Sequence, residues 1–523
     1  MTTSEKHKGL VLLLLASFGL HSIVALIPPL NGDEATFWEW SRHLALGYYA
    51  HPPMTAWLVA LTTNLFGVFK YNVRLPAILL HLGTIIFVYR LTLDLFKSQK
   101  PAFYSALLYA ALPISMVLGT AMTTDAGLVF FFTAAVYYSK LAVIDDKRRS
   151  WYMVGLTGGA MLLTKFMAVL FFPGLFLFLL INGRYRKVFL TKEPYLGSLT
   201  ALLLFSPFLY WNYQNSWLTF QFNFFMRHRE EGFDPVKPIK YLAGQLLAGS
   251  PLVFSLLLAA LVVFLFRLHR KRSRATQKKD DTVLLLSYFT AFPLVYFAGT
   301  SLGVEVAPHW PAIVYGPGVV LLVAWLYKKP SFVTKTPTFQ SGLYWSSFSL
   351  SLVISALLSF LVLFPKVLPD NMIYTENVYE EAPVLSHYFG WKEAGRHIDT
   401  IIKEWEGRPE GLFMTSKDYS LASMLGFYTP SHPNYYLMNV TKDVVHGKSY
   451  LLWEKGKKKL GANTIYVGDE PDSYKKRIPE FFEETRQLDP LIVRDKDGRI
   501  LRIFYITLGL GYLGGEPDNL SLW

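Results

Sequence analysis

Residues 31–57 read NGDEATFWEWSRHLALGYYAHPPMTAW and follow directly on the first long apolar run of the chain. The stretch is too polar for a membrane span, because it carries Asp33, Glu34 and His51 among other ionisable residues, interleaved with tryptophan and tyrosine. Adjacent carboxylates at the mouth of an apolar helix are costly to hold near a bilayer unless they have a function. We therefore interpret residues 31–73 as the active-site loop of a membrane enzyme.

The composition of the whole chain indicates a membrane protein. Of its 523 residues 52% are hydrophobic and only 17% are charged, which is typical of the polytopic membrane class. The absence of cysteine excludes disulfides, thiolate metal sites and thiol nucleophiles. The formal net charge of +13 could suggest a nucleic-acid partner, but the basic residues fall mainly in short loops between apolar runs. The positive-inside rule explains that placement, so we predict no nucleic-acid partner.

The apolar runs predict an α-helical polytopic fold with about eleven transmembrane helices. The N-terminal run, within residues 1–26, has no small-x-small cleavage site before the acidic loop and is followed by further spans, which favours a retained helix over a cleaved signal peptide. The other runs lie near residues 74–96, 101–119, 126–144, 151–164, 166–181, 195–210, 241–266, 282–300, 310–327 and 343–364.

The charged loops predict the orientation of the chain. Most loop Lys and Arg residues fall on alternate connections, which the positive-inside rule assigns to the cytoplasm together with the N-terminus. These connections are residues 97–100, 145–149, 182–192, 267–281 and 327–335. The intervening connections then face the other side of the membrane, and they contain nearly every unusual polar residue of the membrane part.

The character of the chain changes near residue 369. Acidic and basic residues intermix, the apolar runs shorten, and the segments FMTSKDYSLASMLGFYT and NTIYVGD are typical of helix and strand pieces. We predict a transmembrane domain over residues 1–368 and a soluble extracytoplasmic α/β domain over residues 369–523, because an odd number of spans places the C-terminal part on the outer side.

The carboxylates of the loop have two possible roles. Asp33 could act as a general base toward a hydroxyl or stabilise positive charge on a sugar ring, with Glu34 beside it. Alternatively, Asp33 is the N-cap of a helix that begins there. His51 is followed by two prolines, which fix a rigid turn and direct the imidazole, unless this turn is only a boundary between two helices.

The other outer connections add a second acidic residue and several bases. Asp125 precedes an apolar helix and could also be only an N-cap. Lys165 lies between two apolar runs, where it could bind a phosphate or extend to the membrane interface. Three basic residues lie beside aromatic residues and could bind the substrate or only be solvated: Arg227, His228 and Arg229. The last candidate is His309 in VEVAPHW, which could bind the substrate or be structural.

The sequence contains no nucleotide fingerprint. Neither G-x-x-x-x-G-K-[ST] nor a strand followed by G-x-G-x-x-G is present, which argues against a nucleotide-activated donor. An enzyme that acts on the outer face would need an activated group carried by a lipid.

Taken together, these motifs resemble the bacterial branch of the protein O-mannosyltransferase-like glycosyltransferases. The branch includes galacturonic acid transferases of lipid A and of the lipopolysaccharide core, and it is related to the aminoarabinose transferase of lipid A. The resemblance covers nearly the whole chain and is strongest over residues 31–51. It is carried by DEATFWEWSRHLALGYYAHPPMTAWL (33–58), RLPAILL (74–80), TTD (123–125), LLTKF (162–166), SPFLYWNYQNSWLTFQFN (206–223), APHWPA (307–312), FGWKEAGRHI (389–398) and YSLASMLGFYT (419–429).

The resemblance implies a C-type membrane glycosyltransferase fold, a polyprenyl-phosphate-sugar donor and an acceptor such as lipid A, lipopolysaccharide core or another glycolipid or protein. By position, Asp33 matches the family's essential first-loop aspartate, Asp125 its second-loop acidic residue and Lys165 the lysine of the third outer turn. Some relatives have Glu-Lys-Pro where this chain has Ala-His-Pro at residues 50–52. His51 would then replace a phosphate-binding lysine, with a charge that depends on pH.

The expected mechanism is direct displacement at the sugar C1. Asp33 deprotonates or orients the acceptor hydroxyl, while Lys165, Arg227 or Arg229 and His51 stabilise the departing polyprenyl phosphate. A divalent metal could share this role on Glu34, His51 or His309. Two other classes stay open from the residues alone: a transporter or flippase of lipid-linked sugars, and a non-catalytic subunit of envelope assembly.

Overall fold

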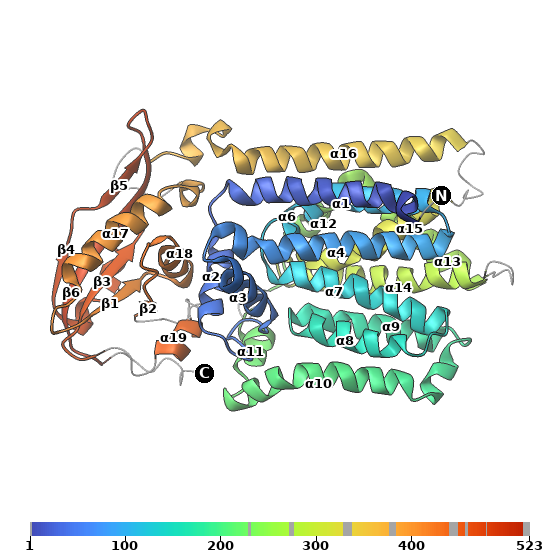
Figure 1. Ribbon diagram of the computed structural model, residues 1–523, viewed down its shortest axis with the longest axis horizontal. Helices are drawn as coiled ribbons and strands as arrows, with labels where there is room; N and C mark the ends of the chain where they lie inside the picture. The colour runs from blue at the N-terminus through green and yellow to red at the C-terminus, as the bar shows by residue number, and fades with distance from the viewer. Residues whose placement is uncertain are drawn as a thin grey trace. The chain divides into compact units, whose positions relative to one another are not determined.

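The computed structural model describes residues 3–227, 232–270, 277–327, 337–375, 383–438, 448–454, 459–476 and 478–515. The chain forms two compact units, which are described separately (Figure 1). Unit 1 consists of Met1–Leu26, His51–Leu58 and Arg74–Ser359. Unit 2 consists of Ile27–Ala50, Val59–Val73 and Phe360–Trp523.

Unit 1 is built from helices. The chain's helices up to residue 363 are α1 (Thr3–Leu26), α2 (Gly32–Arg42), α3 (Met54–Phe66), α4 (Lys70–Phe96), α5 (Gln99–Ala111), α6 (Pro113–Leu118), α7 (Thr124–Ser139), α8 (Ser150–Leu162), α9 (Phe171–Ile181), α10 (Glu193–Gln214), α11 (Leu218–Gln221), α12 (Val236–Ala248), α13 (Pro251–Arg270), α14 (Gln277–Thr300), α15 (Tyr315–Tyr327) and α16 (Pro337–Leu363). Of these, α2 lies in unit 2, and α3, α4 and α16 have residues in both units.

The predicted helical polytopic membrane class is confirmed, but fewer helices than the expected eleven meet the requirements for a span. Six helices among the described residues are long and apolar enough to cross a membrane, or seven if α12 and α13, which meet at a bend of 107°, form one span. Several predicted runs form shorter helices: residues 101–119 are divided between α5 and α6, and α8 has 13 residues. The division occurs before Pro113, because proline disfavours helical geometry at the preceding Leu112, which is extended.

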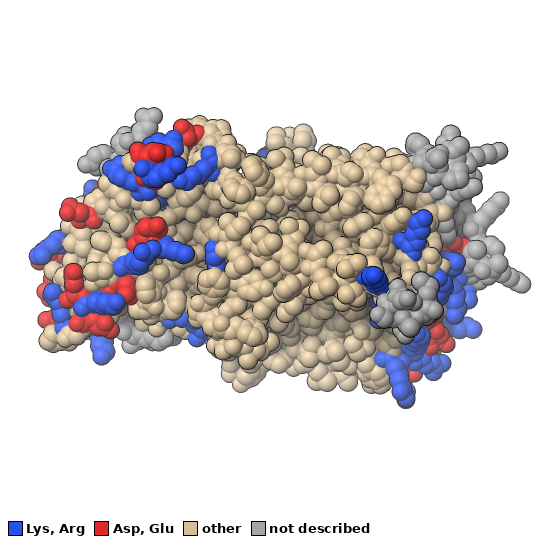
Figure 2. Space-filling view, turned by 45° about the horizontal axis from the view of Figure 1, so that its top comes forward, with Lys and Arg blue, Asp and Glu red and all other residues tan. Residues whose placement is uncertain are grey.

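The helices of unit 1 differ in how deeply they are buried. In α15, 94% of the most apolar window is buried, whereas in α16 only 17% is buried. Helix α15 therefore belongs to the core of the unit, and α16 presents apolar side chains outward. Figure 2 shows a wide surface without charge over the helices, with Lys and Arg gathered at one end of them. This surface is typical of contact with lipid tails.

Helices α8 and α10 of unit 1 pack closely against each other. A Cβ atom added at Gly155 would collide with the carbonyl oxygen of Gly197, and one added at Gly159 would lie 2.9 Å from the carbonyl oxygen of Ala201. Small residues allow two helix backbones to approach, which is the usual means of helix association in membranes. The glycines of 151–164 therefore have a packing role.

Unit 2 contains a mixed β-sheet with helices. Strands β2, β1 and β3 are parallel, and β6 pairs antiparallel with β3, β4 and β5, in the order β2-β1-β3-β6-β4. The prediction of helix and strand pieces in this region is confirmed. The elements are α17 (Trp391–Trp405), β1 (Leu412–Ser416), α18 (Tyr419–Tyr428), β2 (Tyr435–Leu437), α19 (Lys448–Glu454), β3 (Asn463–Gly468), β4 (Phe482–Gln487), β5 (Leu491–Arg494) and β6 (Ile500–Tyr512).

Helix α2 belongs to unit 2 and packs against α18. The ring of Trp38 meets Phe427 edge to face at 5.0 Å, and Arg42 donates hydrogen bonds to the carbonyl oxygen of His432 and to Asn434 Oδ1, both at 2.8 Å. The first part of the loop and the C-terminal sheet therefore form one structural body, although more than 300 residues separate them in the chain.

Candidate active site

A buried ion pair lies at the polar end of helix α7 in unit 1. Lys165 Nζ donates hydrogen bonds to Asp125 Oδ1 at 2.8 Å and to Asp125 Oδ2 at 2.7 Å. The side chains are 8% and 3% exposed, respectively. A pair removed from water in this way is costly unless both charges are satisfied, which makes it a candidate functional group.

Local structure brings the two residues together. Asp125 lies in the first turn of α7, and Lys165 occupies an extended residue between α8 and the 3-10 helix of Phe166–Leu170. A Cβ atom at Gly127 would lie 2.8 Å from Thr164 Cγ2, so α7 and the turn before Lys165 are in close contact. The N-cap residue of α7 is Thr123, and no side chain caps the helix. The alternative that Asp125 serves only as an N-cap is therefore wrong.

His309 and Arg227 extend this cluster. His309 Nε2 lies 3.7 Å from Asp125 Oδ2. The guanidinium of Arg227 lies over the ring of Trp310, with its Cζ 5.3 Å from the ring centroid. Trp310 was not among the predicted site residues. Its position directly after His309 in the motif APHWPA could have indicated it.

The electrostatics of the cluster favour an anionic ligand. The pKa of His309 is lowered, chiefly because protein atoms surround the ring, although 45% of the side chain stays exposed. Asp125 opposes this shift, and Lys165 and Arg227 add to it. With His309 neutral at pH 7, one carboxylate and two cations leave the group with a net charge of +1. Such a group can stabilise a phosphate. We call Asp125, Lys165, Arg227 and His309 the cationic cluster.

The turn that contains His51 is anchored beside Lys165. The backbone N–H of Met54 donates a hydrogen bond of 3.0 Å to the carbonyl oxygen of Leu163, two residues before Lys165. The same region is packed by Phe205 and Phe208, against which Trp57 and Phe166 lie. The two prolines after His51 thus lead into a helix whose first residue is fixed to the Lys165 turn.

In unit 2, the cap of α2 is Asn31. Its side chain accepts a hydrogen bond of 2.9 Å from the backbone N–H of Glu34, and Glu34 Oε2 accepts one of 3.0 Å from the backbone N–H of Asn31. This reciprocal capping box leaves Asp33 in the first turn, exposed. The alternative that Asp33 is the N-cap is wrong, because the residue two positions earlier performs that role.

The carboxylates and histidines considered for a metal do not form a three-ligand centre. Glu34 is fully buried and accepts the capping hydrogen bond, so its carboxylate already has a structural role. Within the part of the chain that the structure describes, no three His, Cys, Asp or Glu side chains converge in a way that could hold a metal ion. No step of the function proposed below uses a metal. The predicted residues His228 and Arg229 lie outside the described residues.

The fold defines a class: a multi-pass membrane protein of the ArnT fold, with a C-terminal mixed β-sheet. The structure superposes on ArnT from Cupriavidus metallidurans bound to undecaprenyl phosphate with a TM-score of 0.63, over 97% of this chain and 99% of that one, at 16% sequence identity. The apo state of that ArnT gives a TM-score of 0.62 at 15% identity, over 95% and 97% of the two chains.

The sequence comparisons place the chain among glycosyltransferases. Residues 50–211 match the family described as dolichyl-phosphate-mannose-protein mannosyltransferase. The lipid A galacturonosyltransferase RgtD of Rhizobium johnstonii is 26% identical over 404 residues, which cover 74% of this chain and 78% of that protein. The undecaprenyl phosphate-alpha-4-amino-4-deoxy-L-arabinose arabinosyl transferase of Aeromonas hydrophila subsp. hydrophila is 24% identical over 34% of this chain and 35% of that protein. The predicted resemblance and the predicted glycosyltransferase class are confirmed.

Proposed function

We propose that this protein transfers a sugar from a polyprenyl-phosphate donor to an envelope acceptor of the lipid A or lipopolysaccharide-core type, on the periplasmic face of a bacterial inner membrane. The observation that carries the proposal is the cationic cluster of unit 1. In this cluster Lys165 and His309 approach Asp125 from separate connections, and Arg227 lies over the ring of Trp310. The cluster lies at the polar end of an otherwise apolar helical unit.

The donor matches the chemistry of this unit. A polyprenyl phosphate joins a long apolar chain to an anionic head, so its site needs an apolar surface that ends in fixed positive charge. Lys165 and Arg227 supply that charge, and Phe205 and Phe208 belong to the apolar packing beside the Lys165 turn. When the bond between the sugar C1 and the phosphate oxygen breaks, negative charge grows on the phosphate. Cations already in place stabilise it without reorganisation.

Asp125 has a positioning role in this proposal. Its two carboxylate oxygens hold the Lys165 ammonium in one place, and a Lys side chain without such a partner has many rotamers. The third hydrogen of the ammonium is then directed to the donor phosphate. His51, at the start of the turn fixed to Leu163, adds a further donor to the phosphate.

Asp33 is the proposed base. It is exposed and lies in the first turn of α2, whose fold depends on Asn31 and Glu34 rather than on Asp33. Asp33 accepts the proton of the acceptor hydroxyl while that oxygen forms its bond to the sugar C1 and the phosphate departs. The proton passes to Asp33 and the electron pair of the broken bond to the phosphate oxygen. If the acceptor is itself a phosphate, Asp33 orients it instead.

The proposed topology has a cytoplasmic N-terminus, about eleven crossings and an extracytoplasmic C-terminal part of unit 2. The six long helices and the bent pair would be joined by four shorter predicted spans: α5 with α6, α8, the segment Phe166–Ile181 and α10. The basic connections 145–149 and 182–192 then face the cytoplasm.

The test is transfer by the purified protein. Polyprenyl phosphate carrying a labelled sugar is incubated with extracted lipid A, and the product is identified by mass spectrometry. We expect labelled lipid A that depends on both substrates and disappears in the Lys165→Met variant. If transfer with a panel of sugar donors is found only to water, or is unchanged in Lys165→Met, the proposed function or its site is wrong.

A further inference from the structure

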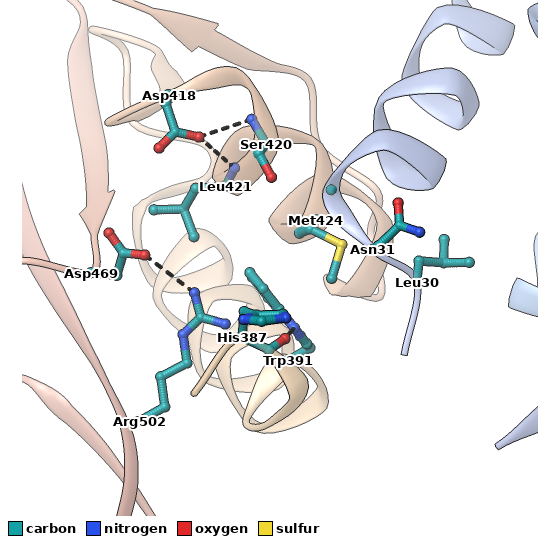
Figure 3. Close-up of a pocket in the computed structure, with 11 residues that line it drawn as sticks. Leu30, Asn31, His387, Trp391, Asp418, Ser420, Leu421, Met424, Asp469 and Arg502 are labelled. Atoms are coloured by element: carbon teal, nitrogen blue, oxygen red, sulfur yellow. Dashed lines mark hydrogen bonds and ion pairs between the residues drawn. The ribbon is translucent and has the colours of Figure 1, made fainter. Parts of the chain in front are cut away.

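Unit 2 contains a cavity that has no role in the proposed function. It has a volume of about 180 Å³ and lies between the start of α2, helices α17 and α18, and strand β6 (Figure 3). Its polar lining comes from Asn31, His387, Asp418, Ser420, Asp469 and Arg502. These residues come from segments far apart in the sequence, so no local motif predicts the cavity.

Arg502 is the unusual group of this cavity. It is only 4% exposed, and its guanidinium lies over the rings of Trp391 and Phe504, at 4.0 and 4.6 Å from their centroids. Nη2 donates a hydrogen bond of 3.3 Å to Asp469 Oδ2. Nε and Nη1 have no hydrogen-bond partner among the described residues. Buried guanidinium groups usually satisfy their donors, so a guanidinium with two unpartnered nitrogens beside a cavity is unusual.

Acceptor groups of the protein face the same space. Asp418 Oδ1 accepts hydrogen bonds of 2.9 Å from the backbone N–H groups of Ser420 and Leu421, which makes Asp418 the N-cap of α18. No bond from the described residues satisfies its second oxygen. The lining therefore combines donors on Arg502 with an acceptor on Asp418.

The charges of the lining disfavour an anion. Arg502 contributes one positive charge, and Asp418 and Asp469 contribute two carboxylates. Lys417 pairs with Asp469 at 3.0 Å. A phosphate or carboxylate that approached Arg502 would meet Asp418 and Asp469, and like charges at such distances repel. A neutral ligand with hydroxyl groups avoids this repulsion, since each hydroxyl can accept from Arg502 and donate to Asp418.

The size and the apolar side of the cavity suit one sugar ring. A volume of 180 Å³ corresponds to about six water molecules at roughly 30 Å³ each, which is the room that a single hexose ring needs. Leu30 and Met424 line the cavity on the side away from Arg502 and Asp469 (Figure 3). A pyranose presents hydroxyl groups at its edge and C–H groups on its faces, and the lining supplies both polar and apolar side chains.

We propose that this cavity is a binding site for one neutral sugar residue, held by Arg502 and Asp418. The inference goes beyond the proposed function and does not rest on it, since sugar binding to unit 2 can be measured without turnover. In the proposed reaction the ligand would be a neutral sugar residue of a glycan.

The test uses the full-length protein in a detergent without a sugar headgroup. Saturation-transfer NMR is recorded with the methyl pyranosides of glucose, galactose and mannose, and in separate samples with a hexuronic acid and with inorganic phosphate as competitor. We expect saturation transfer to at least one neutral methyl glycoside, with no competition from phosphate. The variant Lys165→Met, which alters the cationic cluster, should keep the signal.

Two variants locate the binding. Arg502→Gln removes the unpartnered donors, and we expect binding at least about tenfold weaker, because hydrogen bonds from a charged donor are lost. Asp418→Asn keeps the cap of α18, since Asn caps as well as Asp, but removes the carboxylate acceptor and should also weaken binding. Arg499→Gln is the control: Arg499 is exposed, pairs with Asp370, and should bind the glycoside as the unaltered protein does.

The outcomes are distinct. If Arg502→Gln fails to fold, as judged by thermal unfolding, Asp418→Asn alone tests the proposal. No transfer to any glycoside, transfer that both variants retain, or transfer to the hexuronic acid alone would overturn the proposal. The first result would leave the cavity to water, and the last would assign it to an anion.

Discussion

Lys165 holds both carboxylate oxygens of Asp125, at 2.8 and 2.7 Å, across 40 residues of sequence. The pair is nearly free of solvent, and His309 approaches the same carboxylate from a third connection. This relationship defines the candidate site of unit 1, because it turns a flexible lysine into a cation at a fixed point.

The ion pair predicts that stability and transfer activity respond differently to substitution. Lys165→Met leaves the buried carboxylate of Asp125 without its partner, which should cost about 3 kcal/mol of unfolding free energy. The double variant Asp125→Asn/Lys165→Met removes both charges and should recover much of that loss without recovering transfer. Thermal unfolding in detergent and the transfer assay measure the two quantities.

Lys140 provides the control for this experiment. It is also buried and pairs with Asp94 at 3.1 Å and Asp145 at 2.7 Å, at a connection assigned to the cytoplasm. Lys140→Met should lower the melting temperature but leave the KM for the donor unchanged. Equal effects of Lys140→Met and Lys165→Met on donor KM would contradict the phosphate-binding role of Lys165.

Asp33→Asn should abolish most turnover while the protein stays folded. Asn31 caps α2, so the change at Asp33 removes a proton acceptor and no cap. A general base contributes about 100- to 10,000-fold, and we expect a loss of that order in kcat with donor binding retained.

Glu34→Gln is the neighbouring comparison. A glutamine at this position can still accept the hydrogen bond from the backbone N–H of Asn31, so the capping box should persist and activity should change little. Transfer by Asp33→Asn at the rate of the unaltered protein would remove Asp33 as the base and direct the search to other carboxylates.

The lowered pKa of His309 predicts a pH dependence of stability. In the unfolded chain His309 titrates near its ordinary value of about 6.5, and in the folded protein it titrates lower. The folded state therefore binds fewer protons in this range. The contribution of His309 to stability is complete above about pH 6.5 and is lost as the pH falls through the window down to the folded pKa.

The measurement compares melting temperatures of the unaltered protein and His309→Gln between pH 7.5 and pH 5, values chosen to bracket the ordinary pKa of about 6.5. The unaltered protein should lose more stability on acidification than the variant. Because Asp125, Lys165 and Arg227 all influence this imidazole, a bound donor phosphate should raise its pKa and reduce the difference. Identical pH profiles would show that His309 is not shifted.

Helix packing near the site gives a further prediction. Gly155→Ala places a methyl group against the carbonyl oxygen of Gly197, so α8 and α10 must separate, and overpacking of this kind costs about 1–3 kcal/mol. Gly299→Ala is the control, since nothing lies within 4 Å of the position of its Cβ, and alanine there should be neutral or slightly stabilising. The melting temperatures of the two variants check this contrast.

The absence of cysteine allows a direct test of topology. Single cysteines at Arg148 and Asp497, both exposed, should react with a membrane-impermeant thiol reagent from opposite sides of the membrane. The protein with Asp497→Cys should be labelled in intact spheroplasts, and the protein with Arg148→Cys only after the membrane is opened. Labelling of both from the same side would contradict the proposed orientation.

Much of the architecture could be predicted from the sequence because its signals are local. The long apolar runs predict helices in lipid, and the intermixed charges after residue 369 predict a mixed α/β region. The distribution of Lys and Arg over the loops also predicts that Asp125, Lys165 and His309 belong to one face of the membrane. They are recognisable as candidates because ionisable side chains next to an apolar span are rare. The span count differs from the predicted eleven, because a proline such as Pro113 divides a helix without changing the mean hydropathy of the run.

The tertiary structure alone decided relationships between distant residues. No local pattern indicates that Lys165 bonds to Asp125, that α2 packs against α18, or that Arg502 and Asp418 line one cavity. Capping shows the difference on the smallest scale: Asn31 and Asp33 both suit an N-cap, and only the backbone geometry, extended at Asn31 and helical from Gly32, selects Asn31. The physical reason is general. Hydropathy and turn preference act over a few residues, whereas an ion pair, a helix contact or a cavity depends on the coordinates of segments that folding brings together.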